Sequence, residues 1–287
     1  MNYSKELVKD YVKASKEILK ERFAKLAIDK PEKDNNFLQI NNWSGDSDDS
    51  KMYLSQIIKD CEFYGIKYDI WNSHTTKGIV VDASNYAPPR WGKNYNPVPT
   101  INVSTGFVST YCLNDFNDVE GATVGSRYVP AVAKGMIDFI HLGLCEEVHD
   151  QNVLIIGRGH TMGSRLMRGF LKHHANVMVT HSRTSRDQLE SMIRIADIVV
   201  TATSVPEHIT TEYFEGVLGD HAILIDAGTC FNSEGKLVGN CTSDCYEMIN
   251  KSIGVPGGVG PLTRLALFQN IFRTMDEIGV VENKNMD

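Results

Sequence analysis

The pattern of apolar and polar positions divides the chain into helices and short strands. In residues 2–28 apolar side chains recur every three or four positions, which predicts an amphipathic helix. The same spacing in residues 50–64 predicts a second helix, and Gly65 ends it. Three short apolar runs that predict strands are Phe37–Ile40, Ile66–Trp71 and Gly78–Val81. This alternation already favours an α/β architecture.

The second half of the chain repeats the alternation more regularly. A helix is predicted from Val129 to Leu144, and apolar strands and helices then follow one another towards the end of the chain. The predicted strands are 153–156, 176–180, 197–201 and 222–226, and the predicted helices are 162–171, 186–195 and 264–278. Short apolar strands with helices between them are typical of a doubly wound parallel sheet.

Residues 83–117 interrupt this pattern. Four prolines stand there among asparagine, tyrosine and tryptophan residues, with no helical spacing. We expect a long loop without secondary structure of its own, and such loops are usually functional. The aromatic side chains Tyr86, Trp91 and Tyr95 favour a packed loop near a pocket, and a disordered surface insertion is the alternative.

A strand-to-helix turn rich in glycine runs from Val153 to Gly163, with the sequence VLIIGRGHTMG. A buried strand that turns into a helix in this way presents exposed backbone amides to a phosphate group. Gly157 would allow the tight turn, Gly159 the close approach of the backbone, and Gly163 the close packing of the helix. The spacing GxGxxxG is one residue longer than the commonest dinucleotide motif, and such turns also occur without a ligand.

The end of the next predicted strand indicates which dinucleotide would bind. Sheets that bind NAD usually carry an acidic residue there, which holds the ribose hydroxyl. This chain has THSRTSR instead, and Arg158 lies inside the glycine loop. Guanidinium groups pair with phosphate oxygens, so Arg158, Ser182 and Arg183 favour NADP over NAD, although each arginine alone also fits a solvated loop charge. The candidate cofactor-binding residues are Gly157, Arg158, Gly159, His160, Thr161, Met162, Gly163, His181, Ser182 and Arg183.

Composition and charge narrow the class of protein. The 287 residues, 42% of them hydrophobic, suffice for one or two globular domains. A net charge of −7 argues against a broad surface for nucleic acid or anionic membrane. No apolar run reaches membrane-spanning length and the polar N-terminus does not resemble a signal peptide, so we expect a cytoplasmic protein. The six cysteines lack the spacing of a zinc site, which predicts reduced thiols and no metal.

Seven segments, in order along the chain, resemble the bifunctional methylenetetrahydrofolate dehydrogenase/cyclohydrolase family. They are the helix Ser50–Ile66, GIVVD at Gly78–Asp82, NDVEG at Asn117–Gly121, VPAVAKG at Val129–Gly135, the glycine loop, VTHSRT at Val179–Thr184, and PGGVGPLT at Pro256–Thr263. The last of these matches the family's PGGVGPxT throughout.

The resemblance implies a two-domain enzyme with a pterin site in its cleft. Residues 1–145 and 265–287 would form an α/β catalytic domain that binds folate, with the last helix packing back on it. Residues 146–264 would form the doubly wound, or Rossmann, domain that binds NAD(P). The family oxidises methylenetetrahydrofolate by hydride transfer to NADP or NAD and hydrolyses the methenyl product to formyltetrahydrofolate. Its members are commonly homodimers.

The resemblance also assigns candidate residues on the folate side. Tyr53 matches a family tyrosine that packs on the folate, and Glu120 takes the place of an aspartate that holds the pterin. Asp82 takes the place of a glutamine that partners the family's catalytic lysine. We therefore expect Tyr53, Asp82 and Glu120 to be catalytic. The candidate substrate-binding residues are Tyr53, Glu120, Pro256, Gly257, Gly258, Val259, Gly260 and Pro261.

One departure from the family separates its two reactions. Ile57 stands one helical turn after Tyr53, where the family has the lysine that serves the cyclohydrolase step. Isoleucine can neither transfer a proton nor stabilise developing charge. Lys59 lies roughly 200° further around the helix and cannot replace that lysine. Hydride transfer mainly requires two rings held at reacting distance, so we predict dehydrogenase activity with weak or absent cyclohydrolase activity.

Two other functions are compatible with the sequence. The first is a dehydrogenase or imine reductase for a non-folate substrate, because Asp82 and Glu120 would suit a cationic amine. The second is a non-catalytic relative that binds a nucleotide or folate in regulation or assembly. The intact glycine loop and the PGGVGPLT segment disfavour the second function. The first is harder to exclude, because every departure from the family lies on the substrate side.

Overall fold

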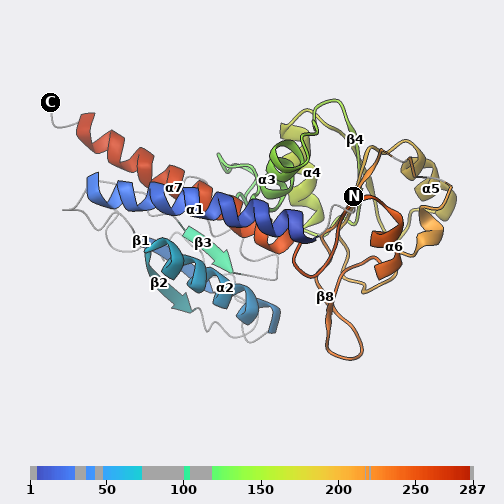
Figure 1. Ribbon diagram of the computed structural model, residues 1–287, viewed down its shortest axis with the longest axis horizontal. Coiled ribbons are helices and arrows are strands. Elements are labelled where there is room, and N and C mark those ends of the chain that lie inside the picture. Colours follow the sequence, from blue (N-terminus) through green and yellow to red (C-terminus); the bar gives the residue numbers. More distant parts are fainter. Residues whose placement is uncertain are drawn as a thin grey trace. The chain divides into compact units, whose positions relative to one another are not determined.

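A computed structural model of the chain describes residues 5–29, 37–42, 48–72, 100–103, 118–216, 218–219 and 221–284. The chain divides into two compact units, which Figure 1 shows with their elements labelled. Unit 1 comprises Met1–Ser15 and Val132–Ala266, and unit 2 comprises Lys16–Ala131 and Leu267–Asp287. The functional division expected from the sequence, residues 1–145 with 265–287 against 146–264, stays a prediction.

Unit 1 contains a five-stranded sheet in which all strands are parallel. Its strands are β4 (Asn152–Ile156), β5 (Asn176–Thr180), β6 (Ile198–Thr201), β7 (Ile223–Asp226) and β10 (Lys251–Ile253). Their order in the sheet is β10-β7-β6-β4-β5. The chain therefore moves from β4 to β5 in one direction and returns past β4 to β6, so the winding direction reverses beside β4. The predicted doubly wound parallel sheet is confirmed.

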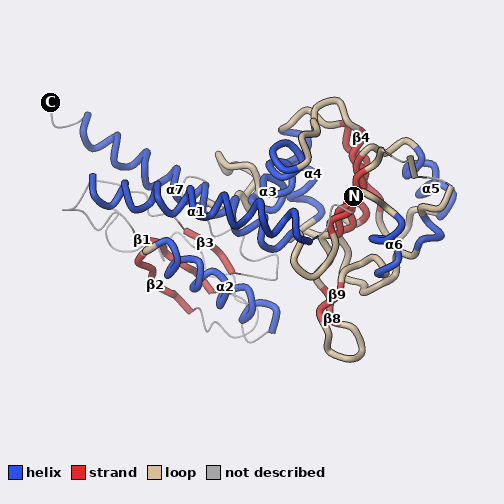
Figure 2. Tube along the Cα trace, in the orientation of Figure 1, coloured by secondary structure: helices blue, strands red, loops and turns tan. Residues whose placement is uncertain are grey.

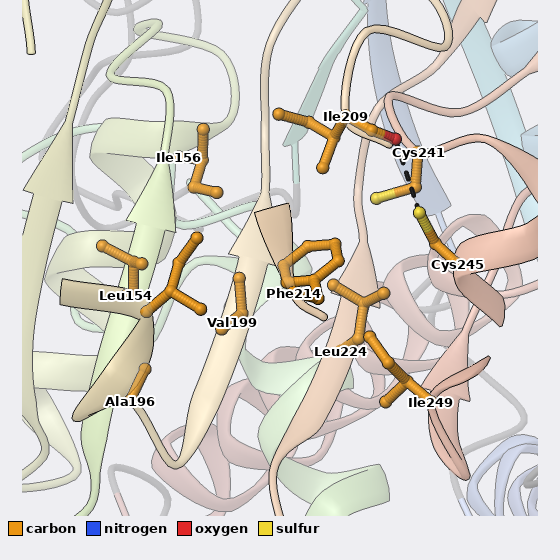
Figure 3. Packing of buried hydrophobic residues seen from close by; sticks show 11 residues of the cluster. Leu154, Ile156, Ala196, Val199, Ile209, Phe214, Leu224, Cys241, Cys245 and Ile249 are labelled. Carbon is orange, nitrogen blue, oxygen red and sulfur yellow. Dashed lines mark hydrogen bonds between the residues drawn. The ribbon is translucent and has the colours of Figure 1, made fainter. Parts of the chain in front are cut away.

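Helices cover both faces of this sheet. Helix α4 (Gly163–Lys172) contacts β4 and β5, and α5 (Arg186–Arg194) and α6 (Ser243–Met248) lie on the opposite side in Figure 1. Figure 3 shows part of the apolar core, in which Leu154, Val199 and Leu224 of three neighbouring strands lie near Phe214. Strands buried on both faces have continuous apolar sequences, which explains why pattern alone located them.

Several short elements complete the chain path of unit 1. The predicted helix 129–144 is observed as α3 (Ala131–Asp138), followed by a π-helical turn, η3 (Phe139–Gly143). A short 3₁₀ turn, η4 (Thr211–Tyr213), follows β6. Strands β8 (Cys230–Phe231) and β9 (Leu237–Val238) form an antiparallel hairpin, which extends away from the five-stranded sheet in Figure 2. The sequence patterns did not predict this hairpin or η4.

Unit 2 contains a three-stranded parallel sheet in the order β2-β1-β3. Its strands are β1 (Phe37–Asn42), β2 (Lys67–Asn72) and β3 (Thr100–Val103), and α2 (Asp48–Tyr64) contacts β2 and β3. The prediction that residues 83–117 lack secondary structure is therefore wrong for β3. The sequence pattern did not predict this strand because Pro99 directly precedes it. Proline cannot donate a hydrogen bond to a sheet and usually marks a strand boundary. The rest of 83–117, and the predicted strand Gly78–Val81 with Asp82, lie outside the described residues.

Two long helices begin and end the described chain, α1 (Lys5–Asp29) and α7 (Val259–Lys284). Within unit 2 the Phe23 ring of α1 packs against Phe272 of α7, with ring centroids 5.2 Å apart, and against Tyr64 of α2, with centroids 5.3 Å apart. Helix α7 begins five residues before the predicted Arg264, because Pro261 falls in its first turn, where proline needs no hydrogen-bond partner. No helix in the described part of the chain is long and apolar enough to cross a membrane.

Candidate functional site

The glycine loop joins β4 to α4 at the carboxyl edge of the five-stranded sheet. Gly157 has a φ of +118°, and a Cβ there would lie 2.2 Å from the Ala202 carbonyl oxygen. A Cβ at Gly163 would lie 2.2 Å from the Gly157 carbonyl oxygen. Both glycines are thus required by the fold itself, as their expected roles in the turn and the helix packing imply. A Cβ at Gly159 would have no neighbour within 4 Å, so the fold leaves that backbone open.

The beginning of α4 is suited to an anion. Its N-cap residue, Met162, supplies no side-chain hydrogen bond to the first turn, and residues 158–161 before it are exposed. The backbone amides at the start of a helix have no intrahelical partner and carry partial positive charge. The loop lies beside β4, where the winding direction of the sheet reverses, and open α/β sheets bind ligands at that position. The arrangement therefore fits the phosphates of a dinucleotide.

A second exposed segment starts at the neighbouring strand end. Ile156 of β4 pairs with Thr180 of β5, and the Gly157 amide donates to the Thr180 carbonyl oxygen at 3.0 Å. The turn that follows closes through the Thr184 amide, which donates to the His181 carbonyl oxygen at 2.8 Å. His181 Nδ1 accepts from the Arg183 amide at 3.1 Å, so only its Nε2 can face a ligand. His181, Ser182 and Arg183 are all exposed.

The predicted cofactor residues therefore lie on two adjoining segments at one edge of the sheet. Arg158, His160 and Thr161 are exposed on the first segment, and Ser182 and Arg183 on the second. No acidic residue stands in the turn after β5, and helix α5 begins directly beyond it with a capping box formed by residues 185 and 188. The side chains available at this edge are thus basic or hydroxylic, which suits a phosphate better than a ribose hydroxyl alone.

A buried carboxylate, which the sequence patterns did not single out, organises the neighbouring strand ends. Asp226 ends β7 and is 0% exposed. Its Oδ1 accepts from Thr201 Oγ1 at 2.9 Å and from the Gly228 amide at 2.8 Å. Its Oδ2 accepts from the Cys241 amide at 2.7 Å and from Tyr246 Oη at 2.6 Å. Four donors around one carboxylate account for its full burial, since each lone pair lost to water is replaced.

Asn240 holds the loop that follows β6. Its Oδ1 accepts from the Thr203 amide at 2.8 Å, while its Nδ2 donates to the Thr203 and Val205 carbonyl oxygens at 3.1 and 2.8 Å. This loop carries Ala202, whose carbonyl oxygen packs on Gly157. Sequence reasoning missed Asn240 because its partners are more than 30 residues away along the chain. Its position directly after a glycine at the end of the β8–β9 hairpin offers no local signal.

The Gly/Pro segment expected to contact substrate is partly loop and partly helix. The Val255–Pro256 peptide bond is cis, and Gly257 has a φ of +102° with the stem of Lys5 beside it. Val259, Gly260 and Pro261 belong to the first turn of α7, so the predicted start of this helix at residue 264 is wrong. Helix α3 packs closely on this first part of α7, because a Cβ at Gly135 would lie 2.4 Å from the Leu262 carbonyl oxygen.

The other candidate substrate residues belong to unit 2. Tyr53 is half-buried on α2, and Ile57 one turn later is 0% exposed. Lys51 and Lys59 on the same helix are exposed, so neither lysine lies on the buried face with Ile57, as predicted for Lys59. The position that the resemblance aligns with the family's lysine is therefore part of the apolar core of this unit.

Glu120 lies half-buried in a tight turn between residues 118 and 121. Asp118, which is 0% exposed, closes this turn by accepting from the Thr123 amide at 2.7 Å and from Thr123 Oγ1 at 3.0 Å. Gly121 has a φ of +71°, and a Cβ there would lie 2.7 Å from Pro130 Cα. The turn is thus held by Asp118 and Gly121, and Glu120 is the remaining carboxylate. Asp82 lies outside the described residues.

The described residues include no group of histidine, cysteine, aspartate and glutamate side chains that could hold a metal ion. A doubly wound parallel sheet, with a glycine loop and an uncapped helix at its reversal point, defines a dinucleotide-binding domain. The family model described as tetrahydrofolate dehydrogenase/cyclohydrolase, NAD(P)-binding domain, matches residues 130–278, just over half of the chain. The chain belongs to the tetrahydrofolate dehydrogenase/cyclohydrolase family. The resemblance inferred from the motifs is confirmed.

Individual relatives support the same assignment. The bifunctional protein FolD of Clostridium novyi is 28% identical over 227 residues, covering 76% of this chain and 74% of that protein. The bifunctional protein FolD of Coprothermobacter proteolyticus is 32% identical over 150 residues, and the alignment covers 52% of this chain and only about half, 53%, of that protein. The FolD structure of Trypanosoma brucei, complexed with NADP cofactor and inhibitor, is 21% identical with a TM-score of 0.74, covering 94% of this chain and 96% of that chain. This likeness confirms the α/β fold.

Proposed function

We propose that the protein is an NADP-dependent methylenetetrahydrofolate dehydrogenase whose cyclohydrolase activity is weak or lost. The observation that carries the proposal is the contrast between its two halves. The glycine loop combines a tight turn at Gly157 with open backbone at Gly159, which supports dinucleotide binding, while Ile57, at the position that the resemblance aligns with the family's catalytic lysine, is 0% exposed. The relatives are bifunctional, so the difference would lie in the second reaction.

The preference for NADP rests on the charges at the edge of the sheet. Arg158 follows β4 and Arg183 follows β5, and both are exposed on adjoining segments. Guanidinium groups bind a phosphate through two parallel hydrogen bonds, and the Ser182 hydroxyl can donate a third. No carboxylate stands in the turn after β5 to bind an unphosphorylated ribose. The 2′-phosphate of NADP would therefore gain charge-assisted hydrogen bonds that NAD cannot make.

NADP, when bound, supplies the hydride acceptor for oxidation of the methylene carbon. The chain would contribute binding and orientation: the open backbone at Gly159 and the amides of α4 would hold the diphosphate. On the substrate side we propose that Tyr53 packs on the pterin and that Glu120 accepts its hydrogen bonds. Residues 256–261 are proposed, from the resemblance, as further folate-binding residues. Asp82 is proposed as a third substrate-side group from the sequence alone. Alignment of two bound rings is the main requirement for hydride transfer, and it needs no proton donor at residue 57.

The hydrolytic reaction has a different requirement. Attack of water on the methenyl bridge involves proton transfer and developing charge, and a positioned acid–base group typically contributes about a hundred- to ten-thousand-fold to such a step. Ile57 has no polar atom, and Lys59 is exposed on another face of α2. We therefore propose that methenyltetrahydrofolate accumulates as the product. We further propose that the enzyme works as a homodimer, as the resemblance implies.

Two spectroscopic assays test the proposal. The first follows reduction of NADP with methylenetetrahydrofolate, comparing wild type with Tyr53→Phe, and the second follows hydrolysis of methenyltetrahydrofolate. We expect NADP reduction by the wild type and hydrolysis close to the uncatalysed rate. Normal enzymatic hydrolysis would refute the loss of cyclohydrolase activity. Dinucleotide binding without NADP reduction at saturating folate would instead favour a dehydrogenase or imine reductase with a non-folate substrate.

A further inference from the structure

Tyr246 contacts two parts of unit 1, the carboxyl edge of the five-stranded sheet and the start of the Gly/Pro segment. Its Oη donates to Asp226 Oδ2 at 2.6 Å and to the Cys241 carbonyl oxygen at 3.4 Å, at the carboxyl edge of the sheet. Its ring lies against Gly254, where a Cβ would be 2.9 Å from Cε2 and 3.1 Å from Cζ. Gly254 directly follows β10 and precedes the cis Val255–Pro256 bond. Tyr246 therefore links the sheet edge to the start of the Gly/Pro segment.

The space around this tyrosine is built to hold it in one position. A Cβ at Gly239 would lie 2.2 Å from Asp226 Oδ2 and 2.8 Å from Tyr246 Oη. Gly239 and Gly254 thus leave room for the hydroxyl and the ring respectively. Ser252 Oγ also donates to the Tyr246 carbonyl oxygen at 3.0 Å, which ties the tyrosine backbone to β10. The side chain is fixed at its hydroxyl, its ring and its backbone.

Asp226, which accepts the hydrogen bond of Tyr246, is also linked to the glycine loop. Asp226 accepts from Thr201 Oγ1 at 2.9 Å, and Thr201 ends β6 immediately before Ala202, whose carbonyl oxygen packs on Gly157. A continuous path of contacts therefore runs from the glycine loop through Asp226 and Tyr246 to Gly254. Burial, and then the charge of Asp226, raise the pKa of the Tyr246 phenol, while the Val255 backbone acts in the opposite direction. The phenol consequently keeps its proton and remains a donor at neutral and moderately alkaline pH.

We propose that Tyr246, held by Asp226, is a positioning residue that sets the Gly254–Pro261 segment relative to the cofactor edge of the sheet. It acts through that segment and does not touch the reacting groups. The consequence for catalysis rests on the proposed function, in which this segment contacts the folate. Hydride transfer depends steeply on the alignment of donor and acceptor, so a small displacement of the segment lowers the rate of transfer more than it weakens binding.

Tyr246→Phe tests this role, because it removes the hydroxyl and keeps the ring on Gly254. Tyr213→Phe is the matched control, since Tyr213 packs against the same apolar core as Tyr246 and its ring faces Arg186 at 4.5 Å. Three quantities are measured in each protein: amide hydrogen exchange of residues 254–260, the Kd of NADP, and the single-turnover rate of NADP reduction with methylenetetrahydrofolate. Gly254→Ala is a second variant, which displaces the segment from the ring and keeps the hydroxyl.

For Tyr246→Phe we expect exchange in residues 254–260 to rise and hydride transfer to fall about tenfold or more, as for one lost hydrogen bond to a charged group. The Kd of NADP should change much less. Gly254→Ala should likewise lower the rate of hydride transfer more than it raises the Kd of NADP. Wild-type exchange and transfer in Tyr246→Phe, or equal losses in Tyr213→Phe, would overturn the positioning role. If the wild type fails to reduce NADP, the proposed function fails, and the exchange of residues 254–260 still decides whether Tyr246 positions them.

Discussion

The three glycines of the loop after β4 should respond differently to the same added methyl group. In Gly157→Ala the new Cβ meets the Ala202 carbonyl oxygen at 2.2 Å, and the residue must keep a φ of +118°. The left-handed backbone costs about 1–2 kcal/mol and the overpacking about 1–3 kcal/mol, so the free energy of unfolding should fall by about 2–5 kcal/mol. In Gly159→Ala the Cβ meets nothing within 4 Å, and stability should change by less than about 0.5 kcal/mol.

Gly159→Ala, which should barely change stability, should nevertheless weaken the binding of NADP. The methyl group of Gly159→Ala stands on the open backbone where the diphosphate would approach, and loss of one charge-assisted hydrogen bond raises Kd by roughly 10- to 100-fold. Thermal or denaturant unfolding measures the first effect, and calorimetric titration with NADP measures the second. Gly159→Ala that is fully stable and binds NADP as tightly as wild type would refute the assignment of this loop as the phosphate site. A stable Gly157→Ala would refute the packing argument.

Three further predictions test other parts of the site. Arg183→Ala and Arg158→Ala, made separately, should each raise the Kd of NADP about 10- to 100-fold, as for a lost charge-assisted contact, and leave the Kd of NAD unchanged. Equal losses for both dinucleotides in a titration would contradict recognition of the 2′-phosphate. Ile57→Lys should increase methenyltetrahydrofolate hydrolysis and leave hydride transfer intact, with Ile57→Met as the uncharged control; a folded lysine variant without added hydrolysis would contradict the role given to this position. Burial, and then neighbouring carboxylates, raise the pKa of Cys61 to about 12, so iodoacetamide at about pH 8 should label exposed Cys145 and spare Cys61 in peptide mass spectra, whereas rapid labelling of Cys61 would show that its burial is wrong.

The features that the sequence predicted well are those encoded by neighbouring residues. Strands β4, β6 and β7 are almost entirely buried, so each appears in the sequence as a mainly apolar run. The edge strand β5 is only partly buried, but its three central residues are apolar, and the helices between the strands carry their own periodicity. The glycine roles could be predicted because a turn between strand and helix imposes conformational demands within a few residues. The strand β3 was missed, because its place in the sheet is decided by pairing with β1 and not by its own four residues.

The candidate site shows the same division. Arg158, Ser182 and Arg183 could be proposed from position alone, since each follows a strand end that the pattern locates. Asp226, Asn240 and Tyr246 could not, because what distinguishes them is a set of hydrogen bonds, most of which join residues 15 to 37 positions apart in the chain. An aspartate at the end of a strand is common, and only its four donors and its complete burial identify it as the centre of a network.

The sequence by itself therefore determined the α/β class, the order of most helices and strands, the family motifs and the replacement of a lysine by Ile57. Only the tertiary structure decided that Ile57 is fully buried, that Gly159 alone of the loop glycines leaves open space, and that Tyr246 joins the sheet edge to Gly254. The physical reason is that periodicity and turn chemistry act over a few neighbouring residues, whereas burial and hydrogen-bond networks depend on which distant segments the folded chain brings into contact.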